Sequence, residues 1–159
     1  MYIYFRNVLG QLEDSKLIKE KLLIKRKLCP IGKNKSLKEN LVIIYWHIAS
    51  FFSGDFFYEY QLIVDDKIVS YARVVPKILK FSFIPKGGYH IGPCMTLEEY
   101  RGNGFYPLLL KYIIKKNNDK DFYMIVDENN IASIKGVKKA GFEEFARGNK
   151  NKFGRYVIV

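Results

Sequence analysis

The sequence predicts a mixed α/β fold, in which helices lie on a β-sheet. Two observations support this fold class. Residues 56–79 contain two runs rich in β-branched and aromatic residues, "FFYEYQLIV" and "IVSYARVVPKIL", separated by the turn "DDK", which predicts a β-hairpin. Farther along, segments with strand and helix character alternate to the end of the chain. A length of 159 residues suits one hydrophobic core, so we expect a single domain over residues 1–159.

The N-terminal residues predict a strand, a helix and a loop. Residues 2–6 ("YIYFR") have the composition of a short strand. Residues 15–28 ("SKLIKEKLLIKRKL") carry apolar side chains at the spacing of an amphipathic helix, with Asp14 or Ser15 as its N-cap. Residues 29–36 ("CPIGKNKS") indicate a loop.

Two signals conflict in residues 41–52 ("LVIIYWHIASFF"). Ser36 and Glu39 have the spacing of a capping box, which begins a helix. The β-branched and aromatic content of the segment favours a strand instead. We predict a short helical turn followed by a strand.

Three further strands are predicted in the second half. Residues 87–96 ("GGYHIGPCMT") form a strand that Gly92 and Pro93 interrupt. Because proline has no N–H group, a proline inside a strand indicates an edge or a bulge, and a bulge there would splay this strand from its neighbour. Residues 121–127 ("DFYMIVD") predict a short buried strand, and residues 155–159 ("RYVIV") a final strand.

Two helices alternate with these strands. Pro107 suits the first turn of a helix. The expected apolar face of this helix consists of Leu108, Leu109, Tyr112 and Ile113. Residues 129–142 ("NNIASIKGVKKAGF") predict a second helix, which Gly141 ends in a left-handed conformation. Its apolar side consists of Ile131, Ile134 and Val137.

The composition excludes several function classes. The formal net charge is +11, carried mostly by lysine, which indicates either an AT-rich genome or an anionic partner. Base readout favours arginine, which is scarce here, so we do not expect dedicated nucleic-acid binding. No apolar run reaches the ~20 residues of a membrane span, and no signal peptide is recognisable. Cys29 and Cys94 lack metal or disulfide spacing, which indicates reduced thiols, a cytoplasmic protein and no bound metal.

A glycine loop precedes the first of the two helices. Gly102 and Gly104 allow a positive φ at two nearby positions and clear a concave backbone surface. A strand, a glycine loop and a helix N-terminus together direct several N–H groups at one point, which favours an anion. The alternative is an ordinary strand-to-helix turn. The dinucleotide fingerprint is excluded because position 107 is proline, and the Gly-Lys-Ser/Thr of a Walker loop is absent.

The segment "TLEEYRGNGFYPLLL" resembles the acetyl-coenzyme A loop of the GNAT superfamily of N-acetyltransferases. The family pattern is Gln/Arg-x-x-Gly-x-Gly/Ala, and Arg101, Gly104 and Tyr106 fall on its three defined positions, with Tyr106 in place of the usual small residue. About 30 residues farther on, "NNIASIKGVKKAGF" resembles the family's Asn-x-x-Ser/Ala helix that ends in Lys-x-Gly-Phe. The matching residues there are Asn130, Ser133, Lys139, Gly141 and Phe142. The resemblance covers roughly residues 56–146.

The resemblance implies a mostly antiparallel sheet flanked by helices and a site for acetyl-coenzyme A. The residues implied to hold the pyrophosphate through their backbone N–H groups are Gly102, Asn103, Gly104, Phe105 and Tyr106, with Arg101 supporting the loop electrostatically. The pantetheine arm would pair like a strand with the backbone of Cys94, Met95 and Thr96. Asn130 would bond to the arm from the other side, and Ser133 would add a contact. The alternative for Asn130 is helix N-capping alone.

The resemblance also implies a position for a general base. Some members use a Glu eleven residues before the first defined position of the loop, and in this sequence that position is His90. An imidazole suits the removal of a proton from an amine, directly or through water. The alternative is a histidine that is hydrogen-bonded within the sheet. Many members use a tyrosine on the last helix to protonate the thiolate; Val137 occupies that position, and Tyr106 and Tyr123 are the nearby substitutes.

We therefore expect an N-acetyltransferase that transfers an acetyl group from acetyl-coenzyme A to a primary amine of a small molecule, with an amino sugar as one candidate. Asp55 and Glu59 are candidates for pairing with the amine, and the alternative for both is ordinary hairpin packing. Two rival hypotheses remain: a coenzyme A sensor without turnover, and a basic nucleic-acid-associated protein. The expected assembly is a monomer or a homodimer.

Overall fold

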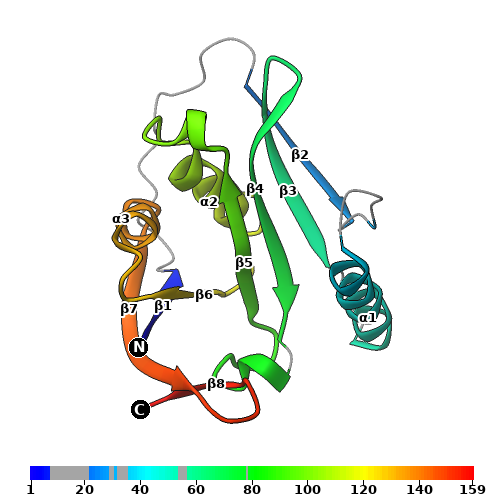
Figure 1. The fold of residues 1–159 in the computed structure, drawn as a ribbon, viewed down its shortest axis with the longest axis vertical. Helices are drawn as coiled ribbons and strands as arrows, with labels where there is room; N and C mark the ends of the chain where they lie inside the picture. Colours follow the sequence, from blue (N-terminus) through cyan, green and yellow to red (C-terminus); the bar gives the residue numbers. More distant parts are fainter. Residues whose placement is uncertain (8–21, 29–30, 32–35, 54–56, 78) are drawn as a thin grey trace.

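One mixed β-sheet forms the centre of the molecule (Figure 1). The computed structural model describes residues 1–7, 22–28, 31, 36–53, 57–77 and 79–159. Within these residues the strands are β1 (Tyr2–Asn7), β2 (Leu22–Leu28), β3 (Tyr58–Val64), β4 (Lys67–Pro76), β5 (Tyr89–Thr96), β6 (Phe122–Asp127), β7 (Phe142–Lys150) and β8 (Tyr156–Ile158). The helices are α1 (Leu37–Ser53), α2 (Phe105–Lys116) and α3 (Ile131–Lys139), with short 3₁₀ turns η1 (Leu79–Phe81) and η2 (Glu98–Tyr100).

The strand order across the sheet is β2-β3-β4-β5-β6-β1-β7-β8. Neighbouring strands run antiparallel except β5 and β6, which are parallel. The expected mixed fold with a mostly antiparallel sheet and flanking helices is confirmed. In the described part of the chain, no helix is both long enough and apolar enough to cross a membrane.

The main core lies between the sheet and α2, which packs against β3, β4 and β5. The predicted helix is confirmed, but its buried face is displaced by one residue toward the C-terminus. Leu109 and Ile113 are buried as expected, whereas Tyr112 is exposed and Leu108 only half-buried. Leu110 and Ile114 complete the buried face. Each such side chain contributes about 1.5–3 kcal/mol by leaving water.

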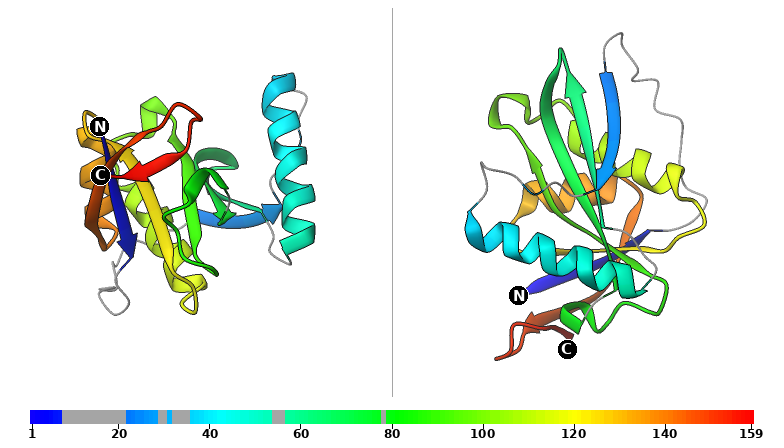
Figure 2. Two further views of the ribbon diagram at one scale, coloured as in Figure 1. Left: turned by 90° about the horizontal axis from the view of Figure 1, so that it is seen from below. Right: turned by 90° about the vertical axis from the view of Figure 1, so that its right-hand side faces the viewer.

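A smaller cluster lies on the opposite face, where Ile43 of α1 packs with Phe57 and Val75. Val74 and Val75 are consecutive on β4 and so point to opposite faces; Val74 belongs to the main core and Val75 to this cluster. Figure 2 shows α1 on the far side of the sheet from α2.

The prediction of a helical turn followed by a strand for residues 41–52 is wrong, because α1 is continuous from Leu37 to Ser53. The capping box explains its start: the Ser36 N–H donates to a Glu39 carboxylate oxygen at 2.9 Å, and the Glu39 N–H donates to the Ser36 hydroxyl at 3.2 Å. Strand propensity depends on packing against neighbouring strands, and α1 packs across a sheet face instead.

The helix predicted for residues 15–28 is also wrong over its described part, since residues 22–28 form β2. Residues 15–21 lie outside the described residues, as does most of the loop predicted at residues 29–36. Every residue of β2 pairs with β3, from Leu22 opposite Val64 to Leu28 opposite Tyr58. Pairing with a distant strand therefore overrides the local helical spacing.

The remaining strand and helix predictions are confirmed, with bounds that shift by a few residues. The hairpin of β3 and β4 turns at Asp65 and Asp66, both with positive φ. Gly141 ends α3 at a φ of +89°. Of the predicted apolar side of α3, Val137 is buried and Ile134 half-buried, but Ile131 is exposed. Strand β7 was not predicted.

Candidate active site

A wedge opens between β5 and β6 in the middle of the sheet. A register shift in the pairing of β5 with β4 places Arg73 opposite two residues, Gly92 and Pro93. In the described part of the chain, β5 pairs with β6 over its first two residues only, and Figure 1 shows β6 diverging from β5 beyond them. The predicted bulge and splay are confirmed, and among the described strands none pairs with the later edge of β5 on that side.

A cavity of about 470 Å³ occupies this wedge. Its lining comes from β5, β6, α2, α3, η1 and β8, and consists of Lys80, Phe81, His90, Ile91, Gly92, Pro93, Cys94, Tyr106, Met124, Ile125, Val126, Asp127, Asn130, Ser133 and Tyr156. The structure thus brings five of the predicted site residues together: His90, Cys94, Tyr106, Asn130 and Ser133. The others lie outside this lining: Met95, Thr96, Arg101, Gly102, Asn103, Gly104 and Phe105.

The glycine loop has the backbone shape that the sequence predicts. Gly102 and Gly104 have φ values of +82° and +76°. The first helical bond of α2 runs from the Leu108 N–H to the Gly104 carbonyl, so the amides of residues 102–106 precede the helical ladder. Over residues 57–77 and 79–159, none of these five amides donates a hydrogen bond to the protein. These backbone donors lie at the positive end of α2.

Two side chains hold this loop in place. The Arg101 guanidinium donates from Nε to the Thr96 carbonyl at 3.3 Å, which ties the loop to the end of β5. The Asn103 amide donates to the Tyr100 carbonyl at 3.3 Å. Both bonds use carbonyl acceptors, so they fix the loop without consuming its N–H donors.

Tyr106 lies against α3 because residue 136 is a glycine. A Cβ at Gly136 would lie 2.5 Å from Cδ1 of Tyr106, so a larger residue and this ring cannot share the space. Tyr106 and Cys94 both line the cavity wall, and each shifts the pKa of the other. Burial raises the pKa of Tyr106, and burial raises the pKa of Cys94 to about 12 despite the opposing effect of Tyr106. Both groups are therefore neutral at pH 7, and Cys94 is a thiol rather than a nucleophilic thiolate.

Asn130 caps α3, as the alternative interpretation expected. Its side-chain oxygen accepts from the Ser133 N–H at 3.1 Å. Asn130 and Ser133 also line the cavity across from β5. The cap engages the oxygen of the amide, and the NH₂ group stays available as a donor.

His90 is a buried wall of the cavity. Its side chain is 7% exposed and stacks on Phe81, with ring centroids 4.0 Å apart. Neither ring nitrogen has a hydrogen-bond partner among the residues that the structure describes. A Cβ at Gly92 would lie 2.7 Å from Cε1 of the imidazole, so the ring requires the glycine beside it. Burial, followed by the positive charge of Lys80, lowers the pKa of His90 to about 3, so the imidazole is neutral at pH 7.

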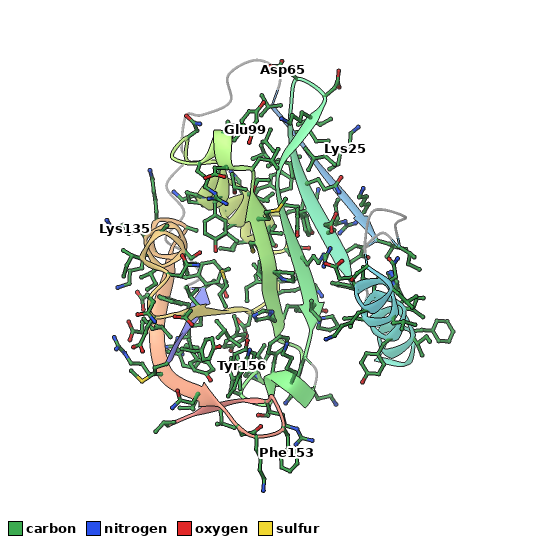
Figure 3. The ribbon with its side chains drawn as sticks, viewed as in Figure 1. Lys25, Asp65, Glu99, Lys135, Phe153 and Tyr156 are labelled. Atoms are coloured by element: carbon green, nitrogen blue, oxygen red, sulfur yellow. The ribbon has the colours of Figure 1, made fainter. Side chains whose placement is uncertain are left out.

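Sequence reasoning missed the residues that surround His90. Phe81 of η1 stacks on His90 and also on Tyr156 of β8, whose centroid lies 5.9 Å away. Figure 3 shows Tyr156 where the C-terminal hairpin passes η1. These three rings form one continuous stack, although they come from positions 81, 90 and 156. No local sequence pattern joins positions that far apart.

Glu59 does not contribute to the cavity. Its carboxylate accepts from Nε of Arg73 at 3.0 Å and from the Gln61 amide at 2.6 Å, and it is buried in the β3–β4 hairpin. The alternative of hairpin packing is therefore the correct one for Glu59. Asp55 lies outside the described residues.

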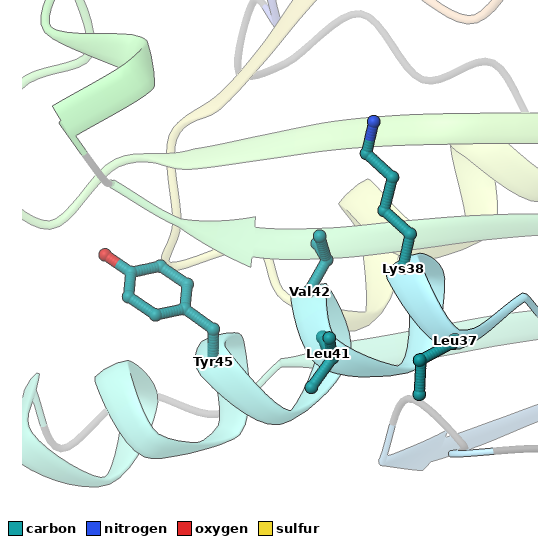
Figure 4. Close-up of a pocket in the computed structure, with 5 residues that line it drawn as sticks. All are labelled: Leu37, Lys38, Leu41, Val42 and Tyr45. Atoms are coloured by element: carbon teal, nitrogen blue, oxygen red, sulfur yellow. The ribbon is translucent and has the colours of Figure 1, made fainter.

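A second cavity, of about 530 Å³, lies on α1 and is lined by Leu37, Lys38, Leu41, Val42 and Tyr45 (Figure 4). All five side chains project from one helix, and the lining contains a single cation and a single phenol. This lining does not combine the acid, base or nucleophile that a particular reaction would need. Among the described residues, no group of three His, Cys, Asp or Glu side chains could hold a metal ion.

The comparisons with known proteins identify the fold. No protein-family model matches this sequence, and no curated protein sequence matches it. Solved structures do. An acetyltransferase from the GNAT family from Colwellia psychrerythraea matches with a TM-score of 0.51 and 13% identity, covering 90% of this chain and 52% of its own.

Two further structures give similar values. A GCN5-related N-acetyltransferase-like protein from Streptococcus suis matches with a TM-score of 0.52 and 16% identity, covering 91% of this chain and 59% of its own. A functionally unknown conserved protein from Staphylococcus epidermidis matches with a TM-score of 0.56 and 14% identity, covering 91% and 57%. This chain thus spans between one half and two thirds of the length of these structures. Its fold is that of the GNAT-family acetyltransferases.

Proposed function

We propose that this chain is an N-acetyltransferase that transfers the acetyl group of acetyl-coenzyme A to a primary amine of a small molecule. The observation that carries the proposal is the row of uncommitted amides at residues 102–106, at the N-terminus of α2 and next to the open edge of β5. Backbone donors at a helix N-terminus favour a pyrophosphate, and an open strand edge favours an extended amide chain. Coenzyme A contains both groups.

Each predicted cofactor residue has a role in this proposal. The amides of Gly102 to Tyr106 bind the pyrophosphate, and the Arg101 side chain holds their loop against β5. The backbone of residues 94–96 pairs with the pantetheine arm along the free edge of β5. Asn130 donates from its side-chain NH₂ group on the other side of the wedge, and Ser133 lies beside it.

When bound, acetyl-coenzyme A supplies a thioester carbonyl. His90 lies in the wall of the same cavity and accepts a hydrogen bond from the amine at its free ring nitrogen. A base with a pKa of about 3 does not deprotonate a free ammonium ion, so the amine must enter uncharged. Attack on the carbonyl makes the amine proton far more acidic, and a weak base is then sufficient to accept it. The Tyr106 hydroxyl lies at the cavity wall and would donate a hydrogen bond to the departing thiolate while keeping its own proton, because its pKa is raised.

The proposal is tested by calorimetric titration of coenzyme A and by thiol release from acetyl-coenzyme A with a panel of amines. In Gly104→Val the left-handed backbone costs about 1–2 kcal/mol, so the loop should rearrange and the affinity should fall about tenfold or more. Gly154→Val is the matched control, because Gly154 also has a positive φ, +72°, and a Cβ added there would meet no atom within 4 Å. Equal affinity of both variants for coenzyme A would refute this location of the pyrophosphate.

A second candidate function is a coenzyme A sensor without turnover. The low pKa of His90 and the buried Val137, where many GNAT members carry a tyrosine, favour it. Tight binding of coenzyme A together with no thiol release from any amine would support the sensor over the enzyme.

A further inference from the structure

The cavity has two chemically different ends. Asn130 and Ser133 line one end, which the proposed function assigns to the cofactor. Lys80, Phe81 and Tyr156 line the other end, where Phe81 stacks on both His90 and Tyr156, and the proposed function does not use these three residues. Resting on the proposed function, we propose that this second end binds an acceptor amine that also carries an anionic group, a carboxylate or a phosphate, and that Lys80 and Lys150 hold that group.

Two ammonium groups converge on one aromatic ring at this end. Nζ of Lys80 lies 5.6 Å from the Tyr156 centroid, and Nζ of Lys150 lies 5.0 Å from the same centroid. The neighbouring Tyr156 side chain raises the pKa of Lys150. In the described part of the chain, neither lysine forms an ion pair with a carboxylate. Lys80 lines the cavity, Lys150 lies over the same ring, and Asp127 is the one carboxylate in the lining, so positive charge exceeds negative charge around Tyr156.

The charge of each lysine acts on its neighbours. Partial burial, followed by the repulsion from Lys150, lowers the pKa of Lys80. The charge of Lys80 in turn contributes to the lowered pKa of His90. An anion bound between the lysines would relieve the repulsion, and it would place the rest of the substrate next to the imidazole.

His90 supplies the independent polar contact that such a substrate needs. His90 is only 7% exposed and lines the cavity. Both of its ring nitrogens lack a hydrogen-bond partner among the described residues. A buried polar group without a partner is costly, and a ligand polar group in the cavity would satisfy it. The stack of Phe81 and Tyr156 forms an apolar wall between His90 and the lysines, which suits a short spacer between an amine and an anion. An amino sugar fits this site only when it carries an anionic substituent.

The test measures kcat/KM of the full chain in pairs of amines that differ in one anionic group. The pairs are phosphoethanolamine with ethanolamine, and β-alanine with propylamine, which separate phosphate from carboxylate. We expect the anionic member of at least one pair to have a kcat/KM about tenfold higher or more. Lys80→Gln and Lys150→Gln should each reduce that ratio about tenfold. The control is Lys152→Gln, a lysine of the same hairpin whose Nζ lies over the exposed Phe153 ring, 5.3 Å away; it should keep the ratio.

A second readout separates this inference from the proposed function. Phosphoethanolamine, β-alanine and inorganic phosphate are titrated calorimetrically into the chain in the presence of coenzyme A. Binding that weakens in Lys80→Gln and Lys150→Gln, without thiol release from any amine, would support the anion site and overturn the transferase. Turnover of neutral and anionic amines at equal kcat/KM, with no change in the lysine variants, would overturn the anion site and support the transferase. Melting temperatures equal to that of the unmodified chain show that each variant folds.

Discussion

The two ends of the cavity are built in different ways. The site that we assign to coenzyme A uses the main-chain amides of residues 102–106, of which only Tyr106 lines the cavity, and the edge of one strand. The end that we assign to the acceptor uses side chains from η1, β5, β7 and β8, most of which are distant in sequence. A constant ligand can be held by backbone geometry, whereas a variable ligand needs side chains that can change without altering the fold. The following predictions test this difference.

The largest effect is expected at the contact that joins α2 to α3 beside the cofactor end. In Gly136→Val the new side chain would clash with the Tyr106 ring, because even a Cβ added at residue 136 would lie 2.5 Å from Cδ1 of Tyr106. Overpacking of this kind costs about 1–3 kcal/mol, so the urea midpoint should fall clearly. The double variant Gly136→Val with Tyr106→Ala should recover part of the loss. Additive losses in the double variant would show that the ring and residue 136 do not compete for space.

The next effect concerns the acceptor end alone. His90→Ala removes the proposed proton acceptor and should lower kcat about 10²-fold, in the range of general base catalysis. The affinity for coenzyme A, measured by calorimetry, should stay within a factor of about two, because His90 lies beyond the cofactor contacts. A parallel loss of coenzyme A affinity would show that the two ends are not independent.

A smaller, pH-dependent effect should also come from His90. Its pKa falls from 6.5 in the unfolded chain to about 3 in the folded chain, so the unfolded chain binds more protons between these values. The contribution of His90 is fully present above pH 6.5 and is lost as the pH falls toward 3, by at most about 1.4 kcal/mol per pH unit. Urea unfolding between pH 7 and pH 4 measures this slope. His90→Gln, which does not titrate, should have a shallower slope; an equal slope would contradict the assignment.

The smallest effect separates two roles of one residue at the cofactor end. Asn130→Asp keeps an oxygen that accepts from the Ser133 N–H, so the α3 cap and the free energy of unfolding should change by less than about 0.5 kcal/mol. The substitution removes the NH₂ donor, so coenzyme A affinity should fall about tenfold, the worth of one good hydrogen bond. Unchanged affinity would mean that Asn130 only caps α3.

Much of the cofactor end was predictable from sequence because it depends on local backbone conformation. Gly102 and Gly104 indicated a positive φ, Pro107 indicated a helix start, and Asn130 indicated a cap; the structure has all of these features. The interruption at Gly92 and Pro93 likewise predicted the bulge that opens the wedge. In each case a single residue type restricts the dihedral angles or hydrogen bonds of its own neighbourhood.

Errors arose where distant contacts decide the outcome. Residues 22–28 have helical spacing but pair with β3, and residues 41–52 have strand composition but form a helix across a sheet face. The composition of residues 2–6 predicts the strand β1, but it does not indicate that β1 lies between β6 and β7 in the sheet.

By itself, the sequence determined the glycine loop, the helix caps and the bulge, since these follow from the allowed backbone angles of a few adjacent residues. Only the tertiary structure decided which strands are neighbours and which side chains surround His90, because pairing and burial depend on segments that the chain brings together from far apart. The stack of Phe81, His90 and Tyr156 is the clearest case: three rings from two strands and a 3₁₀ turn form one wall, and this wall and its two lysines are where we expect the acceptor to be selected.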